Sequence, residues 1–473
     1  MIAHRLLGFA YSVVEDMDAM WGRRLESMDD DESCEPFDDV DPWMSCLYLI
    51  ITVYLFSALG IVCDEWFVPS LEKISEVLQL SSDVAGATFM AAGSSAPELF
   101  VSVADTFGPS HGSGYGIGTI VGSAMFNILV IVAMSAACCS DEIVIDWKPV
   151  VRDCFFYSVA ILVMIVIISD SVVTWYEGLI MVIMYGCYIL FMVFNKKLFD
   201  QMENCKTKLA GRTQDQDELD EATSPTVEMN PVIKSEMGSD QEENGHSSTQ
   251  DKETEEEEDE ADPNNYWHRF EFPEEGVLDQ TYYILTLPAV VAFTLTIPDC
   301  SKTVCEKYYV PTFILSIIWI MILCMFMVQC AAAVGCLLDI SPVIMGIVVL
   351  SVGTSIPDAL GSVAVAKKGE ADMAISNAVG SNVFDILLGL GVPWTLYTIF
   401  SGKSVTMSHQ CSVAVPIAIL FGTLIFFFGV LVANKWKMNN RLGVIFLAFY
   451  FVYLTFQLLV GFNVIVIGGE DCD

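Results

Sequence analysis

The fold of this chain is most constrained by an acidic residue that stands beside a proline inside an apolar run, because the arrangement occurs twice. The first copy reads Gly93-Ser94-Ser95-Ala96-Pro97-Glu98, and the second reads Gly353-Thr354-Ser355-Ile356-Pro357-Asp358. Proline lacks the N–H that would bond the carbonyl four residues earlier, so the carbonyls of Gly93 and Gly353 lose their helical partners. Inside an apolar segment, a free carbonyl and a carboxylate are costly unless they line a cavity or bind a cation. The duplication therefore predicts two broken helices that supply oxygen ligands to a cation site.

A second pair of matching segments follows these motifs, Val121 to Leu129 in the first half and Val379 to Leu387 in the second. At helical spacing, hydroxyl groups lie about one turn before an acid or amide, so their oxygens share one face of the helix. The residues so related are Ser94 and Ser95 before Glu98, Ser123 before Asn127, and Ser381 before Asp385. An all-oxygen set suits hard cations such as calcium and sodium, and does not suit zinc or copper.

The number of carboxylates indicates which cations fit. Glu98 and Asp358 supply two negative charges, which match one divalent cation, and calcium accepts a flexible shell of oxygen ligands. Asp385 adds a third charge where the first half has the neutral Asn127. A third buried carboxylate requires a proton or another cation. The set therefore suits one divalent and one monovalent ion, with a protonated Asp385 as the alternative.

Composition separates the chain into apolar and acidic segments. Of the 473 residues 54% are hydrophobic, yet the formal net charge is −38. The acidic residues concentrate in residues 1–42, expected to be an extracellular tail, and in residues 195–281, expected to be a disordered cytoplasmic loop. This balance argues against nucleic acid and anionic lipid as partners.

Ten apolar runs predict an all-α multi-pass membrane protein. The runs are Trp43 to Cys63, Ala85 to Phe107, Ile117 to Ala137, Phe155 to Ile168, Val172 to Phe194, Pro311 to Leu338, Pro342 to Ala366, Ala374 to Phe400, Ser412 to Val432 and Leu442 to Ile467. They form a first membrane repeat at residues 43–194 and a second at 311–467. Residues 282–298 are also apolar, but this run is short and interrupted by Pro288, so we expect an interfacial or re-entrant helix on the cytoplasmic side.

Basic residues indicate the orientation of the spans. Five spans in each repeat invert the second repeat if the acidic loop stays on one side of the membrane. With the N-terminus outside, the outer connections between spans contain Lys403 alone, whereas the other lysines and arginines of the connections face the cytoplasm. The bias favours ten spanning helices arranged as two inverted five-helix repeats.

Small side chains in the apolar runs are expected to serve packing. The 15 cysteines show no metal-binding spacing, and we interpret those in apolar runs as packed side chains. One disulfide bond among Cys34, Cys411 and Cys472 is left open. Close helix contacts, with flexing of sliding helices as the alternative, are expected at Gly86, Gly118, Gly122, Gly346 and Gly380.

At the two motifs and their partner segments the chain resembles the cation/calcium exchanger superfamily, and within it the potassium-dependent sodium/calcium exchangers. The resemblance is close from Val84 to Phe100 and from Gly380 to Leu387, and looser from Ile61 to Lys73. It covers both membrane halves but neither the acidic tail nor the central loop.

This resemblance implies roles for individual residues. Glu98 and Asp358 would be the central calcium ligands. Asp385 would be the acid linked to potassium, since potassium-independent members carry asparagine at that position. Sodium or calcium ligands would be Ser94, Ser95, Ser123, Asn127, Thr354, Ser355 and Ser381, beside the carbonyls of Gly93 and Gly353.

The sequence therefore predicts a secondary active antiporter that exchanges sodium for calcium plus potassium. We expect a transporter and not an enzyme, without a cofactor, whose partners are the three transported ions and the lipid bilayer. The plasma membrane is favoured over an internal membrane. The alternatives are a proton/calcium exchanger, and a non-coupled cation channel or calcium-binding membrane scaffold. The unequal internal repeat argues against a pore, and the hydroxyls beside the acids favour sodium over protons.

Overall fold

The computed structural model describes residues 44–78, 91–108, 112–138, 143–192, 276–301, 305–367, 371–406, 410–462 and 464–465. The expected acidic tail, most of the expected loop, and Gly86 lie outside these ranges. Within them, nine helices are long and apolar enough to cross a membrane. The remaining predicted span, Ala85 to Phe107, is described only from residue 91. A count of ten spans and the predicted segment boundaries therefore stay predictions.

Two sets of elements follow one another in the same order. The first set contains α2 (Met44–Val62), η3 (Cys63–Phe67), α3 (Val68–Val77), α5 (Ala91–Ser94), α6 (Ala96–Phe107), α7 (Tyr115–Phe126), η5 (Asn127–Ile131), α8 (Val132–Cys138), β1 (Ile143–Val144), α9 (Trp147–Ile168), β2 (Val172–Val173) and a helix at Trp175–Met192. The second contains α12 (Tyr309–Leu338), α13 (Pro342–Met345), η8 (Gly346–Leu350), α14 (Ser351–Thr354), α15 (Ile356–Lys367), α16 (Ala371–Phe384), η9 (Asp385–Leu390), α17 (Gly391–Ser401), β3 (Val405–Thr406), α18 (Gln410–Ala433), β4 (Lys437–Met438) and α19 (Asn440–Gly461).

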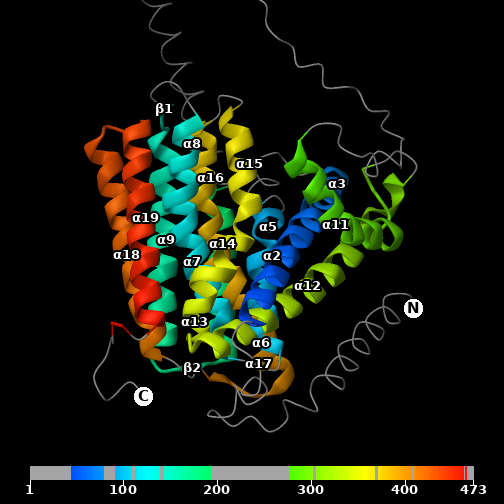
Figure 1. Ribbon diagram of the computed structural model, residues 1–473. Helices are drawn as coiled ribbons and strands as arrows, with labels where there is room; N and C mark the ends of the chain where they lie inside the picture. The colour runs from blue at the N-terminus through cyan, green and yellow to red at the C-terminus, as the bar shows by residue number, and fades with distance from the viewer. Residues whose placement is uncertain are drawn as a thin grey trace, which may run out of the picture. The chain divides into compact units, whose positions relative to one another are not determined.

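Matching elements of the two sets run in opposite directions. In Figure 1 the chain descends through α5 and α6 and rises through α7 and α8, whereas it rises through α14 and α15 and descends through α16 and α17. The strands agree, because β1 pairs with β4 and β2 pairs with β3. Each pair joins two connections that the sequence places on the same side of the membrane. Two sets that ran in the same direction would put these connections on opposite sides, so the pairing is the one that an inverted repeat requires.

Helix breaks occur at the duplicated motif in both sets. The helix stops after Ser94 and restarts at Ala96, and it stops after Thr354 and restarts at Ile356. The proline stands at the second position of each new helix, where a missing N–H leaves no bond unmade. The breaks predicted from Pro97 and Pro357 are confirmed.

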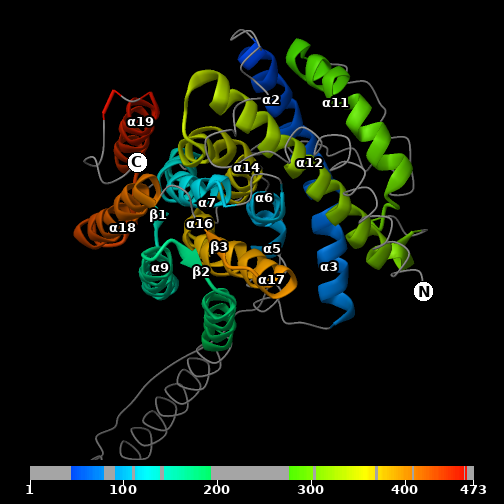
Figure 2. The same ribbon diagram turned by 90° about the horizontal axis from the view of Figure 1, so that it is seen from below.

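The partner segments share a second irregularity, a π-helical turn. One begins at Asn127 and the other at Asp385, which are the equivalent residues of the two sets. Such turns widen the helix locally and are frequent at functional sites. Figure 2 shows α6, α7, α14 and α16 in the middle of the helices, between the α2–α12 pair on one side and α9, α18 and α19 on the other.

Glycines allow the backbones of α7 and of α13–η8 to touch. A Cβ on Gly118 would collide with the carbonyl oxygen of Val343, and a Cβ on Gly346 would come within 2.7 Å of the Tyr115 carbonyl oxygen. A Cβ on Gly122 would lie 2.5 Å from the Ser351 hydroxyl. The expected close contacts are therefore confirmed at Gly118, Gly122 and Gly346.

Replacing Gly118 with alanine is expected to destabilise the protein, because the added methyl group meets backbone and not a mobile side chain. Overpacking of this kind costs roughly 1–3 kcal/mol. Gly422→Ala in α18 is the matched control, since a Cβ there meets nothing within 4 Å. Thermal unfolding of the purified protein in detergent should show a lower midpoint for Gly118→Ala alone. Equal midpoints for the two variants would contradict the close contact.

The first long helix extends beyond the apolar run predicted to span the membrane. It continues past Cys63, the predicted end of that run, through a π-turn to Val77. Asp64, Glu65 and Pro69 suggested an end, but Pro69 occupies the second position of α3, where proline is tolerated. The run at residues 282–298 forms part of one continuous helix, α11 (Val277–Thr296), which packs on α2. Its interfacial or re-entrant placement stays a prediction.

One cysteine departs from the expected packing role. Cys336, near the end of α12, is disulfide-bonded, so its interpretation as a packed apolar side chain is wrong. Cys34, Cys411 and Cys472, between which one bond was left open, lie outside the described residues or have side chains outside them. The predicted orientation puts the end of α12 on the outer side of the membrane, where disulfide bonds persist.

Candidate functional site

Both acids of the duplicated motif lie in the first turn of a restarted helix. Glu98 is the third residue of α6 and Asp358 is the third residue of α15. A helix N-terminus stabilises negative charge, so the break makes a buried carboxylate tolerable. Glu98 is completely buried and Asp358 is 9% exposed. The break thus lowers the cost of placing two carboxylates inside the apolar part of the protein.

The two motifs reach across to one another. The Ser355 hydroxyl donates a hydrogen bond to Glu98 Oε1 at 3.2 Å, and Thr354 also interacts with this carboxylate. In return, the Ser94 hydroxyl hydrogen-bonds to Asp358. Each acid is therefore bound by hydroxyls of the opposite half, and the six-residue motifs form one site between the halves.

Asn127 links the first half to α16. Its amide nitrogen donates to Ser381 Oγ at 3.3 Å and to Asn382 Oδ1 at 3.0 Å. The amide oxygen finds no hydrogen-bond partner among the described residues. Because the nitrogen is used by α16, the oxygen of Asn127 is the atom available to a ligand, and its predicted role at a cation stays a prediction.

Asp385 is the equivalent of Asn127 and has different surroundings. It is 1% exposed, and neither carboxylate oxygen has a hydrogen-bond partner within the described part of the chain. The Ser95 hydroxyl lies beside it and interacts with the carboxylate. Glu98 and Asp358 are near enough to repel the Asp385 carboxylate. The three acids therefore act as one electrostatic group.

Unpartnered oxygens gather at this junction. Besides the Asp385 and Ser95 oxygens, they are Glu98 Oε2, Asp358 Oδ1 and Asn127 Oδ1. A buried polar atom without a partner costs about 1–3 kcal/mol, and a charged one costs more, unless a ligand satisfies it. No three His, Cys, Asp or Glu side chains among the described residues converge on one metal position.

The remaining predicted residues lie around this junction. Ser123 is buried and donates to the Ile120 carbonyl oxygen at 3.1 Å, and Thr354 donates to the Ser351 carbonyl oxygen at 3.3 Å. Gly93 and Gly353 face α3 and α2, where a Cβ would meet the side chains of Val68 and Phe56. The assignment of these residues, and of their carbonyls, as ligands stays a prediction.

Two polar features of the site were missed in the sequence. Asn382 is completely buried and orients Asn127, and the signal was an amide three residues before Asp385 in an apolar helix. Asp105 is also buried, and accepts hydrogen bonds from Ser113 Oγ at 2.8 Å and from the Gly116 N–H at 3.0 Å. Asp105 thereby caps the start of α7 and fixes the turn between α6 and α7.

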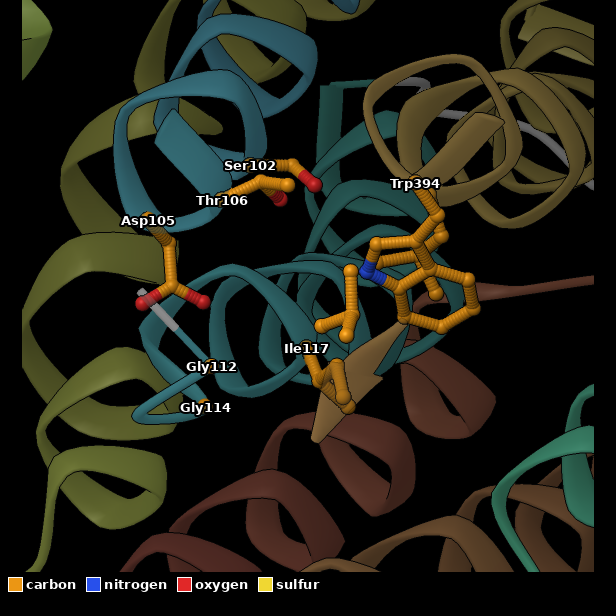
Figure 3. Close-up of a pocket in the computed structure, with 9 residues that line it drawn as sticks. Ser102, Asp105, Thr106, Gly112, Gly114, Ile117 and Trp394 are labelled. Atoms are coloured by element: carbon orange, nitrogen blue, oxygen red, sulfur yellow. The ribbon is translucent and has the colours of Figure 1, made fainter. Parts of the chain in front are cut away.

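A pocket lies at the end of α6, two turns beyond Glu98. Figure 3 shows the Ser102 and Thr106 side chains on one wall, with Trp394 opposite and Ile117 below. Ser102, Asp105 and Thr106 lie on the same face of α6 as Glu98, because they follow it by four, seven and eight residues. A polar stripe thus connects the pocket with the acids.

Comparison with known proteins decides the family. The model of the sodium/calcium exchanger protein family matches residues 48–194 and 308–459, which include every site residue named above. The chain belongs to the sodium/calcium exchanger family. It is 34% identical to sodium/potassium/calcium exchanger 4 of Mus musculus, over 88% of this chain and 82% of that protein. It is 37% identical to sodium/potassium/calcium exchanger 5 of Homo sapiens, over 89% and 84%.

These relatives place this exchanger-family chain among the sodium/potassium/calcium exchangers, in the cation/calcium exchanger superfamily. A solved structure of the sodium-calcium exchanger NCX_Mj aligns with 88% of this chain and 99% of its own, with 20% identity and a TM-score of 0.43. The long apolar helices among the described residues make the chain a mostly helical, multi-pass membrane protein.

Proposed function

We propose that this protein is an antiporter that exchanges sodium for calcium together with potassium. The observation that carries the proposal is the junction of the two halves. There, Glu98 and Asp358 are bound by each other's motif, and Asp385 adds one further unsatisfied carboxylate. The relatives named sodium/potassium/calcium exchangers support the same three ions.

Charge and ligand type assign the ions. Glu98 and Asp358 neutralise calcium, whose flexible oxygen shell accepts carboxylates, hydroxyls and carbonyls. Asp385 neutralises one potassium ion. Sodium ions occupy the same oxygens when calcium and potassium leave, and the hydroxyls of Ser94, Ser95, Thr354 and Ser355 supply neutral ligands for them. Because the two sets of ions need the same carboxylates, the binding of one set excludes the other, and this exclusion couples their transport.

Access alternates when the helices beside the site move. The α2 and α12 helices pack against one another and lie to one side of the site (Figure 2). Gly93 and Gly353 lie against the long first helix, and because they are glycines they project no side chain into their contacts with it. We propose that the α2–α12 pair slides against the site helices, and that the pocket beside Trp394 is the outer approach.

A sodium-driven calcium flux would distinguish this proposal from its rivals. Purified protein is reconstituted in calcium-loaded vesicles, and sodium and potassium are varied independently outside and inside. Antiport predicts calcium efflux that requires external sodium and internal potassium. Efflux without any counter-ion would indicate a channel. Efflux driven by a proton gradient, and indifferent to sodium, would indicate a proton/calcium exchanger.

The orientation and membrane of residence belong to the same proposal. The disulfide bond at Cys336 supports an outer end of α12, and the strand pairs support the inverted arrangement. An outer side that permits disulfide bonds fits the plasma membrane. Labelling of single cysteines introduced at Lys403 and at Lys437 in intact cells would test this, with only the former accessible from outside.

A further inference from the structure

The helix α9 carries a buried tyrosine hydroxyl that no hydrogen bond satisfies among the described residues, and it packs on the segment that begins with the third acid. Tyr157 is completely buried, and its hydroxyl has no hydrogen-bond partner in the described residues. Tyr157 and Tyr185 both feel the charge of Asp385. Helix α9 lies beside α16 (Figure 2) and also packs against η9, which begins at Asp385. The next polar residue toward the N-terminus of α9, Asp153, is already satisfied, because Arg152 and the Tyr188 hydroxyl both donate to it.

The two pseudo-symmetric halves can be compared to find which tyrosine contacts occur in both and which occur beside Asp385 alone. Tyr185 packs edge-on against Phe384, the residue before Asp385, with ring centroids 5.5 Å apart. Tyr450 packs edge-on against Phe126, the residue before Asn127, with centroids 5.7 Å apart. This tyrosine–phenylalanine contact occurs in both halves, so it does not depend on whether an acid or an amide follows.

Tyr157 has no such counterpart. The helix α18 packs on α7 as α9 packs on α16. From Val413 to Ala433 its one side chain with a hydrogen-bonding atom is Thr423, and that hydroxyl donates to the Ile419 carbonyl oxygen at 2.9 Å. The helix that packs on the acid-bearing segment therefore carries a tyrosine, and the helix that packs on the amide-bearing segment carries none.

The acceptors that hold the Asn127 amide on α16 have no counterparts that hold Asp385 on α7. Asn127 bonds to Ser381 and Asn382 on α16. The equivalent residues on α7 are Ser123, which bonds to its own helix, and Ala124, which has no polar atom. Asp385 thus lacks on α7 the polar partners that Asn127 has on α16, and its buried carboxylate suits a cation.

We propose that the Tyr157 hydroxyl is a neutral oxygen ligand of the potassium ion held at Asp385. This inference rests on the proposed exchange of sodium for calcium plus potassium. One carboxylate with uncharged oxygens from Tyr157 and Ser95 gives a site of charge −1. Uncharged oxygens can replace the hydration shell of potassium. A single negative charge matches a monovalent ion and leaves a divalent ion uncompensated.

The test is the potassium dependence of sodium-driven calcium flux in Tyr157→Phe. Loss of one neutral ligand is expected to raise the half-saturating potassium concentration about tenfold, with the calcium dependence unchanged. Tyr450→Phe removes another buried, unpartnered hydroxyl of the described residues, on the side of Asn127, and should leave the potassium dependence as in wild type. An unchanged potassium dependence in Tyr157→Phe would overturn the inference.

A second readout does not depend on transport. Potassium should raise the thermal unfolding midpoint of the purified protein, and Tyr157→Phe should need about tenfold more potassium for the same rise. In an Asp385→Asn background, Tyr157→Phe should have no further effect, and an additional shift there would show that the tyrosine acts elsewhere.

If wild-type protein shows neither sodium-driven flux nor a potassium requirement, the result contradicts the proposed function itself. Wild-type flux that requires potassium, with Tyr157→Phe identical to wild type, rejects this inference alone.

Discussion

Glu98→Gln is expected to lower sodium-driven calcium transport by about 100-fold or more. Removing one of the two charges that face calcium costs a Coulomb energy of a few kcal/mol at an effective dielectric constant of about 20, and each 1.4 kcal/mol is about tenfold in affinity. Glutamine keeps the shape of the side chain and can still accept from Ser355, so the loss reports charge and not packing. The measurement is calcium efflux from reconstituted vesicles at saturating sodium and potassium.

The matched control for this change is Asp105→Asn. Asp105 is a second buried acid on α6, seven residues beyond Glu98, and the substitution removes the same charge. Asparagine can still cap the start of α7, so folding and most of the transport should be retained. Equal losses in Glu98→Gln and Asp105→Asn, with both proteins folded, would show that the acids act through the field of the whole protein and not as direct ligands.

The broken helices could be predicted from the sequence because their cause is local. Pro97 and Pro357 each remove a backbone donor, and the chain has little choice but to stop and restart the helix. The duplicated segments also predicted that both halves supply oxygens to one site, and the structure brings Glu98 together with Ser355, and Asn127 with Ser381. Those meetings are long-range, but a repeated motif at equal depth in two halves leaves few alternative arrangements.

The features that were missed depend on tertiary packing. The π-turns at Asn127 and Asp385 leave no pattern in residue spacing, since the same apolar residues suit an ordinary helix. Tyr157 lies in an apolar run outside either motif, and its proximity to Asp385 requires α9 to pack on α16. The extension of the first helix to Val77 was not predicted because Asp64 and Glu65 interrupt the apolar run, and both side chains are exposed in the structure. These features depend on how the helices pack together, and the sequence alone does not show which helices are neighbours.

Asp385→Asn is expected to abolish the potassium requirement while calcium transport continues. The acid has no hydrogen bond to lose within the described residues, so a neutral amide of nearly equal volume should cost the fold little. It removes the charge that potassium compensates and restores the symmetry with Asn127. The two acids that neutralise calcium remain, so the calcium dependence should change by no more than a few-fold.

The measurement is calcium efflux with potassium raised from zero at fixed sodium. Wild-type flux should rise from near zero to saturation, whereas Asp385→Asn should give flux that is independent of potassium. A variant that still requires potassium would remove Asp385 from the potassium site, and Tyr157 with it. A variant that loses all transport although it is folded would show that the three carboxylates bind calcium together. The division of the site into a divalent and a monovalent position depends on this outcome, because only Asp385 lacks a charged counterpart in the other half.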